Sequence, residues 1–375
     1  MRTQFMLERI ILKGYKSIRD ADISLRPINI LIGANGSGKS NFISLFKFMN
    51  RVVNRGMQKY VAQSGGADQM LYYGSKTTDR ITIELWFQKN KKLANGYKCV
   101  LIPSAEDLLL FDFEIIYFHD RKRYKRPFIS EVSDHVHNET ILPDWKHKRG
   151  RVAYYVLKAL QSWQLYHFHD TSESAKVRQT SDINDNIFLR PDASNLAAYL
   201  YLLQETQPEY YQNIVDTIRL AAPFFGDFVL RPSPFNPDKI RLEWKERGSD
   251  MLFGPQSLSD GTLRFICLTT LFLQPLEKLP ATIVLDEPEL GLHPYAIVLL
   301  ADMIRSVAKH TQVILSTQSV TLVNQFSFED ILVVDRVEGE TILRRLSEKE
   351  IVSWLEDYGL GDLWEKNLLG GRPRP

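Results

Sequence analysis

The feature that most constrains the fold is the octapeptide GANGSGKS at residues 33–40. An apolar run at residues 28–32 comes directly before it and predicts a strand, and apolar residues recur at helical spacing from Phe42 to Met49. Strand, glycine-rich loop and helix is the order of a phosphate-binding loop, whose backbone N–H groups face an anion at the positive end of the helix. The sequence therefore predicts an α/β layer with a phosphate site at its edge. A glycine-rich turn with an incidental lysine is the alternative.

Each fixed position of this loop has a chemical role. Three glycines let the backbone turn with its N–H groups inward, Lys39 offers a positive charge to the β and γ phosphates of a nucleotide, and Ser40 offers a hydroxyl to Mg²⁺. The candidate nucleotide-binding residues are Gly33, Asn35, Gly36, Ser37, Gly38, Lys39, Ser40 and Asn41. We therefore expect ATP and Mg²⁺ as cofactors.

An acidic motif follows much later in the chain. The apolar residues 282–285 predict a buried strand, which places Asp286 at the carboxyl end of a parallel sheet, where ligands of α/β folds bind. Asp286 can there hold Mg²⁺ together with Ser40, and Glu287 can polarise the water that attacks the γ phosphate. Two solvated acids at a strand end are the alternative. The presence of the phosphate loop in the same chain favours the catalytic interpretation.

A third motif, SLSDGT at residues 257–262, precedes an apolar helix predicted for residues 262–274. Ser259 and Gly261 at a helix N-terminus offer a hydroxyl, free N–H groups and a positive dipole end, which together suit an anion. Taken alone, the pattern is also that of an ordinary N-cap. Its place before the acidic strand favours a second phosphate contact.

The remaining pattern predicts the other elements. Further strands are predicted at residues 10–12, 21–25, 163–168 and 312–316, and an antiparallel sheet at 81–87, 98–102 and 108–119. Helices are predicted at residues 195–204, 210–222 and 294–309. Residues 171–186 are rich in Ser, Thr, Asp and Asn and predict an exposed loop.

Composition excludes several classes of protein. With 375 residues, of which 44% are hydrophobic and 25% charged, the chain can bury a large core and is neither collagen-like nor disordered. The net charge of +2 means that any basic site must be local. Cys99 and Cys267 are too few for a disulfide framework and agree with a reducing compartment. Neither a signal peptide nor a membrane-spanning run is evident, so we expect a cytoplasmic protein with no membrane partner.

The motif set resembles a known family. The phosphate loop, LSDGT, the strand that runs into DEPE, the later STQS and the opening GYKSIRD resemble the nucleotide-binding head of the ABC ATPase superfamily, in its RecF, SMC and OLD-like soluble branch. The closing GLGDLWEKNLLGGRPRP is similar to compact ATPases of that branch. The resemblance implies an α/β head with a mixed or parallel P-loop sheet flanked by helices, an antiparallel β lobe and a small helical insertion. The expected division is lobe I at 1–170, the loop and helical insertion at 171–255, and lobe II at 256–375.

The resemblance also implies an ATP-dependent homodimer. LSDGT of one subunit would close on ATP held by GANGSGKS of the other, and residues 288–293 would form the D-loop along the seam, with His293 starting a helix. Many relatives place a switch histidine where this sequence has Gln318, and glutamine cannot carry a positive charge. We therefore expect Glu287 and Gln318 as the catalytic pair, with slow hydrolysis that depends weakly on pH.

The glutamine that links lobe I to Mg²⁺ in this superfamily has no match by spacing. His169 and Asp170, at the end of the strand predicted for residues 163–168, are the candidates. Ordinary polar residues at a strand end are the alternative.

A basic cluster suggests a nucleic-acid contact. Arg121, Lys122, Arg123, Lys125 and Arg126 surround Tyr124, and a second basic run spans residues 146–151. Phosphate contacts with base stacking suit such a surface, and a solvated charged hairpin is the alternative.

Two functions remain open. The favoured one is an Mg²⁺-dependent ATPase whose dimerisation acts as a switch in a nucleic-acid-linked process, such as DNA repair or antiphage defence, with a separate effector. The alternative is an ATP-sensing scaffold with negligible turnover that restrains a nuclease or toxin. The 57 residues after Gln318 are too few for a nuclease domain, so a nuclease would be a partner. A transporter subunit is disfavoured because it would require a membrane partner, which this chain does not reveal. A long coiled-coil arm is disfavoured because residues 171–255 lack heptads.

Overall fold

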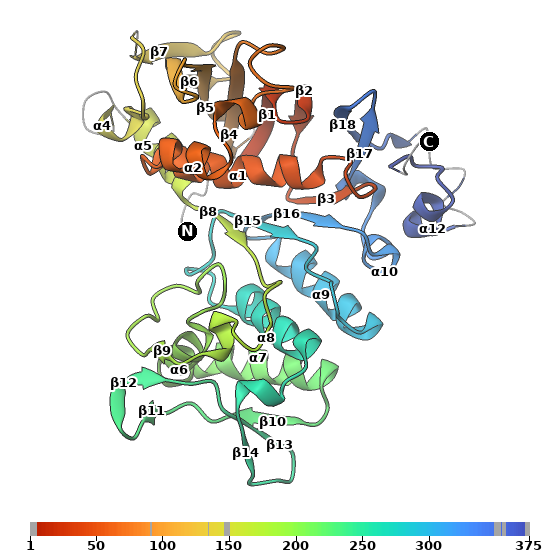
Figure 1. Cartoon of the computed structure of the whole chain (residues 1–375). Coiled ribbons are helices and arrows are strands. Elements are labelled where there is room, and N and C mark those ends of the chain that lie inside the picture. Colours follow the sequence, from red (N-terminus) through yellow and green to blue (C-terminus); the bar gives the residue numbers. More distant parts are fainter. Residues whose placement is uncertain are drawn as a thin grey trace.

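The glycine-rich loop leaves the middle of a six-stranded sheet. In the computed structural model, which describes residues 6–90, 92–133, 135–145, 151–348, 354 and 358–371, this sheet has the order β18-β17-β3-β16-β15-β8 (Figure 1). Its strands are β3 (Ile28–Ile32), β8 (Trp163–Tyr166), β15 (Thr282–Asp286), β16 (Gln312–Thr317), β17 (Ile331–Val337) and β18 (Glu340–Arg345). All neighbours pair in parallel except β17 and β18, which form an antiparallel hairpin. The expected P-loop sheet is confirmed.

This P-loop sheet is buried on both faces, and successive apolar residues of its strands pack into opposite cores. In β3, Ile30 and Ile32 pack into the core on the side of α8 (Asp260–Leu273) and α9 (Pro294–Val307), whereas Leu31 packs into the core on the side of α1 (Lys39–Val53). The same division separates Ile283 and Leu285 from Val284 in β15. Side chains of successive strand residues point to opposite faces, so a continuous apolar run supplies both cores.

A second, antiparallel sheet forms the upper lobe in Figure 1, in the order β2-β1-β4-β5-β6-β7. Its strands are β1 (Met6–Tyr15), β2 (Ile18–Ser24), β4 (Ile81–Asn90), β5 (Leu93–Pro103), β6 (Leu109–Asp120) and β7 (Phe128–Ser133). The helices of this lobe are α1, α2 (Met57–Gln63), α3 (Ala67–Met70), α4 (Leu142–Trp145) and α5 (Arg151–Gln161). We call this part the antiparallel lobe, and its presence confirms the expectation.

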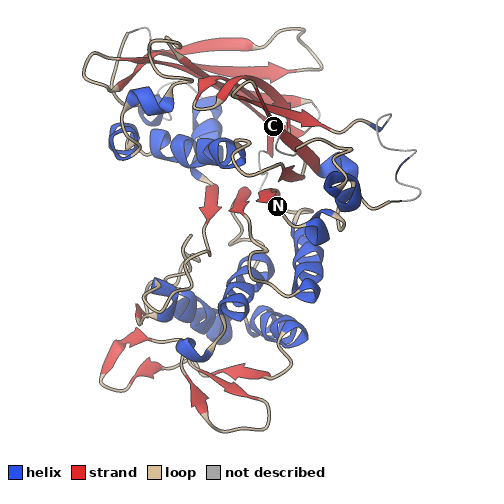
Figure 2. Cartoon of the chain, turned by 45° about the vertical axis from the view of Figure 1, so that its right-hand side comes forward, coloured by secondary structure: helices blue, strands red, loops and turns tan. Residues whose placement is uncertain are grey.

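The lower part, below the P-loop sheet in Figures 1 and 2, holds α8 and α9 together with α6 (Leu196–Thr206) and α7 (Pro208–Ala221). It also contains two small three-stranded sheets that the sequence reading did not anticipate, of order β10-β13-β14 and β11-β12-β9. These strands are β9 (Ser181–Asp182), β10 (Phe225–Phe228), β11 (Pro232–Ser233), β12 (Asn236–Ile240), β13 (Trp244–Glu246) and β14 (Leu252–Phe253). The insertion is therefore helical with a β tip. We call this lower part the helical lobe.

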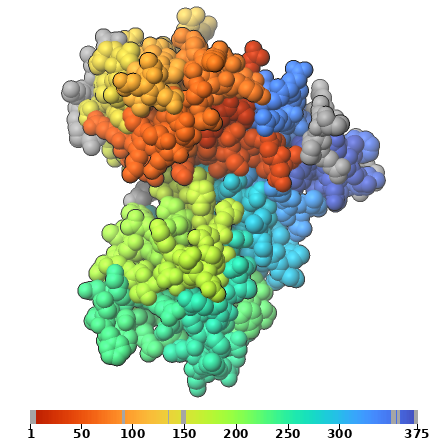
Figure 3. Space-filling view, in the orientation of Figure 1, coloured from red at the N-terminus to blue at the C-terminus, as the bar shows by residue number. Residues whose placement is uncertain are grey.

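The remaining elements are short. They are α10 (Val320–Val323), α12 (Leu360–Glu365) and the 3₁₀ helices Lys176–Arg178, Pro255–Ser257 and Phe328–Asp330. The space-filling view shows the surface narrowing between the antiparallel and helical lobes (Figure 3). Among the described residues, no helix combines the length and apolarity that crossing a bilayer would require.

Residues 171–186 differ from the exposed loop expected from their composition. Ala175, Val177 and Arg178 are buried. The Arg178 guanidinium donates to the backbone carbonyls of Thr171, Pro255 and Leu258, so the segment is fastened to the start of α8. The polar composition of the segment gives no sign of this anchor, since two of the three carbonyl partners, Pro255 and Leu258, lie 77 and 80 positions away in the sequence.

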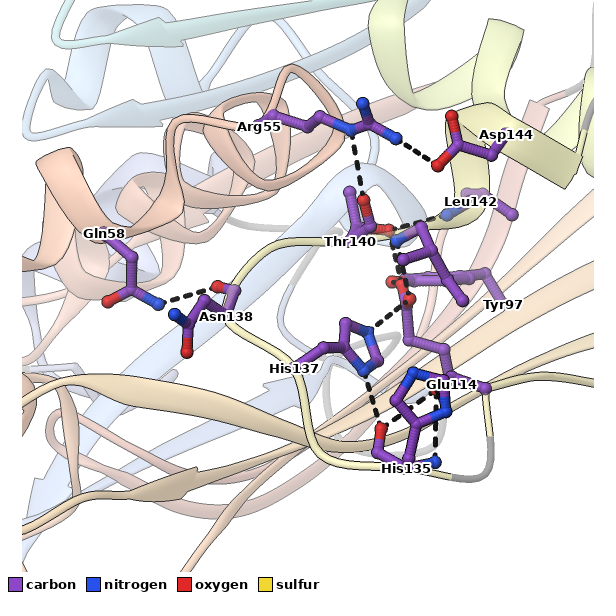
Figure 4. Close-up of polar contacts among 12 residues, drawn as sticks. Arg55, Gln58, Tyr97, Glu114, His135, His137, Asn138, Thr140, Leu142 and Asp144 are labelled. Atoms are coloured by element: carbon purple, nitrogen blue, oxygen red, sulfur yellow. Dashed lines mark hydrogen bonds and ion pairs between the residues drawn. The ribbon is translucent and has the colours of Figure 1, made fainter.

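The antiparallel lobe also contains a buried polar cluster (Figure 4). The Glu114 carboxylate is fully buried and accepts hydrogen bonds at 2.5 Å from both the Tyr97 and the Thr140 hydroxyls. His137 Nε2 lies 3.0 Å from its other oxygen, which also accepts from the Ile141 N–H. Burial lowers the pKa of His137, but hydrogen bonds to Glu114 and to the His135 carbonyl outweigh that effect and raise it. The cluster ties residues 137–141 to the sheet.

Candidate active site

The phosphate loop has the backbone conformation that its glycines permit. Gly36 and Gly38 have φ of 76° and 108°, in the region that L side chains rarely adopt. A Cβ on Gly38 would lie 2.0 Å from the Thr341 hydroxyl, so a larger residue would also collide with the β17–β18 hairpin. Helix α1 begins at Lys39, directly after this turn, which leaves the backbone N–H groups of its first turn without intrahelical partners.

Lys39 folds back over the loop that carries it. Its ammonium donates to the carbonyls of Gly33 at 2.6 Å and Ala34 at 3.0 Å, and the residue is buried. Burial lowers the pKa of Lys39, although the negative charges of Glu287, Asp286 and Glu289 oppose that shift. The lysine and the acids of the distant motif therefore share one electrostatic site.

Other loop residues leave groups available for a ligand. Asn35 and Ser40 are exposed. The buried Ser37 hydroxyl has no hydrogen-bond partner among the described residues. An orphaned hydroxyl, unpaired helix N–H groups and a buried ammonium within one loop suit a phosphate chain.

Three residues outside the predicted set hold the loop in place. Thr341 donates from its hydroxyl to the Ser37 carbonyl at 2.8 Å and lies 2.7 Å from the Ser17 hydroxyl. Ser17 in turn accepts from Asn41 Nδ2 at 2.6 Å, and Arg336 donates to the Gly36 carbonyl at 3.1 Å. Ser17 lies in the GYKSIRD segment, which the family resemblance had marked. Thr341 and Arg336 lie on a hairpin for which the sequence motifs gave no signal.

A cavity of 590 Å³ lies beside this network. Its lining includes Lys16, Ser17, Asn41, Tyr73 and Arg336, which come from the β1–β2 turn, α1, the segment before β4 and the end of β17. The cavity adjoins the phosphate loop through Asn41 and Arg336.

Residues 316–318, at and just after the end of β16, contact each of the three acids at and just after the end of β15. Ser316 donates from its hydroxyl to Asp286 Oδ1, and Gln318 donates from Nε2 to Glu287 Oε1. The Thr317 hydroxyl donates to Glu289 Oε1 at 2.5 Å. The structure therefore brings Glu287 and Gln318 together. Asp286 is the last residue of β15, as its position after four apolar residues predicts.

Glu287 has an unusual backbone. Its φ is 42°, in the left-handed region, and its N–H donates to the Ser316 carbonyl at 2.9 Å. A non-glycine residue in this conformation costs free energy that the surroundings must supply, and such positions cluster at functional sites. The turn directs the acid out of the strand.

Glu289, which the sequence places in the D-loop but not among the catalytic residues, is part of this site. It is 7% exposed, its Oε1 also accepts from the Gln318 N–H at 3.1 Å, and its buried Oε2 has no partner among the described residues. Burial raises the pKa of Glu289.

Ser259 and Gly261 begin α8 at an exposed helix tip. The Ser259 hydroxyl accepts from the Thr262 N–H at 3.2 Å, which is the N-cap geometry. Within the described residues, no hydrogen bond joins Ser259 or Gly261 to the phosphate loop of the same chain. A Cβ on Gly261 would lie 2.3 Å from the Gly291 carbonyl oxygen, so α8 and the D-loop touch directly.

Buried Arg264 strengthens that contact. Its guanidinium donates to the Leu290 carbonyl of the D-loop and to the carbonyls of Phe168 and His169 after β8. Burial lowers the pKa of Arg264. One side chain thus joins α8, the D-loop and the segment that follows β8.

Strand β8 ends at Tyr166, which pairs with Leu285, so His167 follows the last paired residue of β8 as Asp286 follows that of β15. The N–H of His167 donates to the Pro191 carbonyl at 2.9 Å. Burial is the main cause that lowers the pKa of His167, and the Asp286 charge opposes it. His167, His169 and Asp170 all have exposed side chains, and Asp170 accepts hydrogen bonds from Ser172. His293 caps α9 by accepting from the Tyr295 N–H, which agrees with a helix-start role.

A P-loop between parallel strands, acids at the end of β15 two strands away, and a helix tip formed by LSDGT define an ABC-type ATPase head of the SMC and RecF-like branch. Solved structures share this fold.

The chain belongs to the family described as "AAA domain, putative AbiEii toxin, Type IV TA system", whose model matches residues 28–94 and 101–324. No curated protein shows a significant match.

Three solved SMC heads illustrate the similarity of fold. An SMC head bound to the C-winged helix domain of ScpA matches with a TM-score of 0.61 and 15% identity, over 92% of this chain and 99% of that chain. A head with an extended coiled coil, bound to the C-terminal domain of ScpA and derived from Pyrococcus furiosus, gives 0.55 and 15%, over 94% and 99%. A head with coiled coil and joint from Pyrococcus yayanosii gives 0.52 and 11%, over 94% and 99%.

Proposed function

We propose that this chain binds and hydrolyses ATP with Mg²⁺, and that ATP drives two copies into a head-to-head dimer that acts as a switch. The observation that carries the hydrolysis step is the meeting of the Lys39 loop with the acids held by the end of β16. Lys39 and the free N–H groups of α1 would bind the phosphates. Glu287 would orient and polarise the attacking water, with Gln318 fixing its carboxylate.

Ser40 and Asp286 would hold Mg²⁺. Of the two carboxylate oxygens of Asp286, only Oδ1 accepts a hydrogen bond from a described residue. The described residues contain no group of three Asp, Glu, His or Cys side chains that could hold a metal ion. One carboxylate, one hydroxyl, phosphate oxygens and water suit this ion, which would neutralise phosphate charge. The base and ribose would occupy the cavity beside Ser17 and Arg336, where Tyr73, which packs edge-on against Tyr72, is 57% exposed.

Turnover of the purified chain tests the hydrolysis step. Glu287→Gln should lower kcat by about 10²- to 10⁴-fold while ATP still binds, as expected for the loss of a general base. Lys39→Ala should instead lose nucleotide affinity. Because Gln318 carries no charge, we expect slow turnover without a histidine-like titration near neutral pH. Normal hydrolysis by Glu287→Gln would contradict the assignment of the base.

The proposed dimer would bring Ser259 of one copy to the nucleotide of the other. Its support is the exposed tip of α8, together with exposed Leu290 and Tyr295, which are 49% and 50% exposed on and just after the D-loop. Apolar residues exposed close to an exposed helix N-terminus suit a self-complementary twofold contact.

A nucleic-acid contact is a further part of the proposal. The basic cluster lies in the turn between β6 and β7, where Arg121 pairs with Glu8 and Arg123 lies 3.6 Å from Asp120. Three cations remain without an ion pair among the described residues: Lys122, Lys125 and Arg126. Residues 146–150 of the second basic run lie outside the described residues. The described structure therefore supports a nucleic-acid contact with three cations, which is fewer than the two basic runs of the sequence contain.

Duplex binding followed by fluorescence anisotropy tests this contact. Replacing Lys122, Lys125 and Arg126 by Glu should weaken binding and lower the steepness of its salt dependence by about 0.9 for each lost phosphate contact. Identical binding and salt dependence in the triple variant would assign the cluster to a solvated turn.

The biological process that we propose for this ATP-driven switch is DNA repair or antiphage defence in the cytoplasm.

The alternative is an ATP-sensing scaffold that restrains a nuclease or toxin. The observation that favours it is that each of the two small sheets of the helical lobe carries an exposed apolar residue in a turn, since Phe235 is 99% and Met251 64% exposed. Copurification of an effector with an intact nucleotide site but negligible turnover would support the scaffold. DNA-stimulated hydrolysis by the isolated chain would support the switch.

A further inference from the structure

The buried carboxylate of Glu289 holds the end of β16 through a single oxygen. Its Oε1 accepts from the Thr317 hydroxyl at 2.5 Å and from the Gln318 N–H at 3.1 Å. The Thr317 oxygen then accepts from the Ser319 N–H at 3.0 Å. The last residues of the strand are thus fixed at the point where the chain turns into α10. Hydrogen bonds to a buried charged group are among the stronger ones in proteins.

These contacts determine where Gln318 can place its amide. The backbone N–H of Gln318 is held by Glu289, while its side-chain Nε2 donates to Glu287 Oε1. Gln318 itself is exposed, so packing does not confine it. Removing the Glu289 carboxylate would therefore release the backbone from which the Gln318 side chain reaches Glu287.

Glu289 also connects this pair to the helix tip that would contact a second copy. Directly after it, the Leu290 carbonyl accepts from Arg264 of α8, and the Gly291 carbonyl lies against Gly261. A shift of α8 is consequently transmitted to the D-loop that carries Glu289. The D-loop lies between the dimer-facing tip and the catalytic pair.

Only one of the two oxygens of this acid has a hydrogen-bond partner in the described part of the chain. Oε2 of Glu289 is buried without a partner in the described part of the chain, and burial raises the pKa of the carboxyl. An unsatisfied buried polar atom lowers the stability of a fold, and an apolar side chain of similar size often fills such a place at lower free energy. Residues that break the rules of packing in this way concentrate at functional sites.

We propose that Glu289 is a positioning residue for hydrolysis, which locks the Gln318 amide onto the Glu287 carboxylate and links that pair to the D-loop. This inference rests on the proposed ATPase function. It assigns Glu289 no contact with ATP, Mg²⁺ or water. The expected loss on removing it is therefore in kcat and not in nucleotide affinity.

Steady-state turnover and ATP-binding calorimetry on two full-length variants test the proposal. Glu289→Met matches the length of the side chain without an acceptor, and should lower kcat about 10- to 100-fold, as misplacement by a fraction of an ångström does. Its Kd for ATP should stay within about threefold of wild type, because it leaves the phosphate loop intact. Glu289→Gln keeps an acceptor oxygen for Thr317 and Gln318, and should retain most of the wild-type kcat.

A double-variant cycle separates positioning from general damage to the fold. In a Gln318→Ala background, Glu289→Met should cause little further loss, because both changes break the same chain of contacts. Multiplying losses would contradict the proposal, as would wild-type kcat in Glu289→Met. If Glu289→Met does not fold, Thr317→Val provides the test, since it deletes the hydroxyl that Glu289 holds and should also lower kcat with Kd unchanged. A wild-type chain that binds ATP without turnover would refute the proposed function and this inference together, whereas normal turnover in all variants would refute only the inference.

Discussion

Replacing Gly261 by alanine tests the contact between α8 and the D-loop. A Cβ at this position would lie 2.3 Å from the Gly291 carbonyl oxygen, and ordinary contacts begin at 3.4 Å, so the two backbones must separate by about 1.1 Å. Because the obstructing atom belongs to the backbone, no side-chain rotation can relieve the clash. Arg264 holds the same D-loop from the neighbouring turn of α8 and resists the separation.

The sign of the stability change is the informative quantity. In a helix free of such contacts, Gly→Ala stabilises by up to about 1 kcal/mol. Overpacking of a close contact destabilises by about 1–3 kcal/mol. We therefore expect Gly261→Ala to lower the free energy of unfolding by about 1 kcal/mol, measured by urea denaturation. A displacement of this size in the D-loop should also reduce kcat by about 100-fold.

Gly56→Ala is the matched control. Gly56 lies between α1 and α2 with φ of −129°, and its nearest neighbour to an added Cβ is 3.7 Å away. This variant should show wild-type stability and turnover. If Gly261→Ala instead stabilised the chain and kept normal turnover, α8 and the D-loop would not be in contact as described.

Three further predictions follow from the same network of contacts. Thr341→Val removes the hydroxyl that donates to the Ser37 carbonyl. Loss of this hydrogen bond, worth about 1 kcal/mol, should weaken ATP binding about fivefold in a calorimetric titration. Unchanged affinity would show that the hydroxyl does not shape the loop. Because Glu114 raises the pKa of His137, the protonated imidazole stabilises the fold. This stabilisation is complete below the pKa of the unfolded chain and is lost as the pH rises through the pKa of the folded chain. His137→Gln should therefore lower the free energy of unfolding more at pH 5.5 than at pH 9, and equal losses at the two pH values would contradict this. Arg178→Met should lower both the melting temperature and ATP-dependent dimerisation, because the start of α8 loses its carbonyl anchor; wild-type behaviour by thermal melting and light scattering would exclude that anchoring role.

Local patterns predicted much of the fold. The apolar run into the phosphate loop, the runs at 81–87 and 282–285, and the helix beginning at Pro294 all lie where expected, because burial on one or both faces produces a regular spacing. The small strands within residues 225–253 were missed. Several have only two or three residues, too short to show a period.

Motif spacing could place side chains along the chain but not their partners across it. The pairing of Gln318 with Glu287 spans 31 positions, and that of Thr341 with Ser37 spans 304. Arg264 lies within an apolar helix and Arg178 within a polar loop, so neither signals a buried anchor. Glu289 was visible in DEPE, but its burial depends on the neighbouring strand. Tertiary contact, and not local chemistry, assigns such roles.

The most direct test of the central claim is the mass of the Glu287→Gln protein in solution, measured by size-exclusion chromatography with light scattering. With ATP and Mg²⁺ it should be twice the monomer mass, and it should return to one copy when Ser259→Arg blocks the helix tip or when nucleotide is removed. A protein that binds ATP and remains a monomer under every condition would contradict the proposal that the tip of one copy closes on the nucleotide of another.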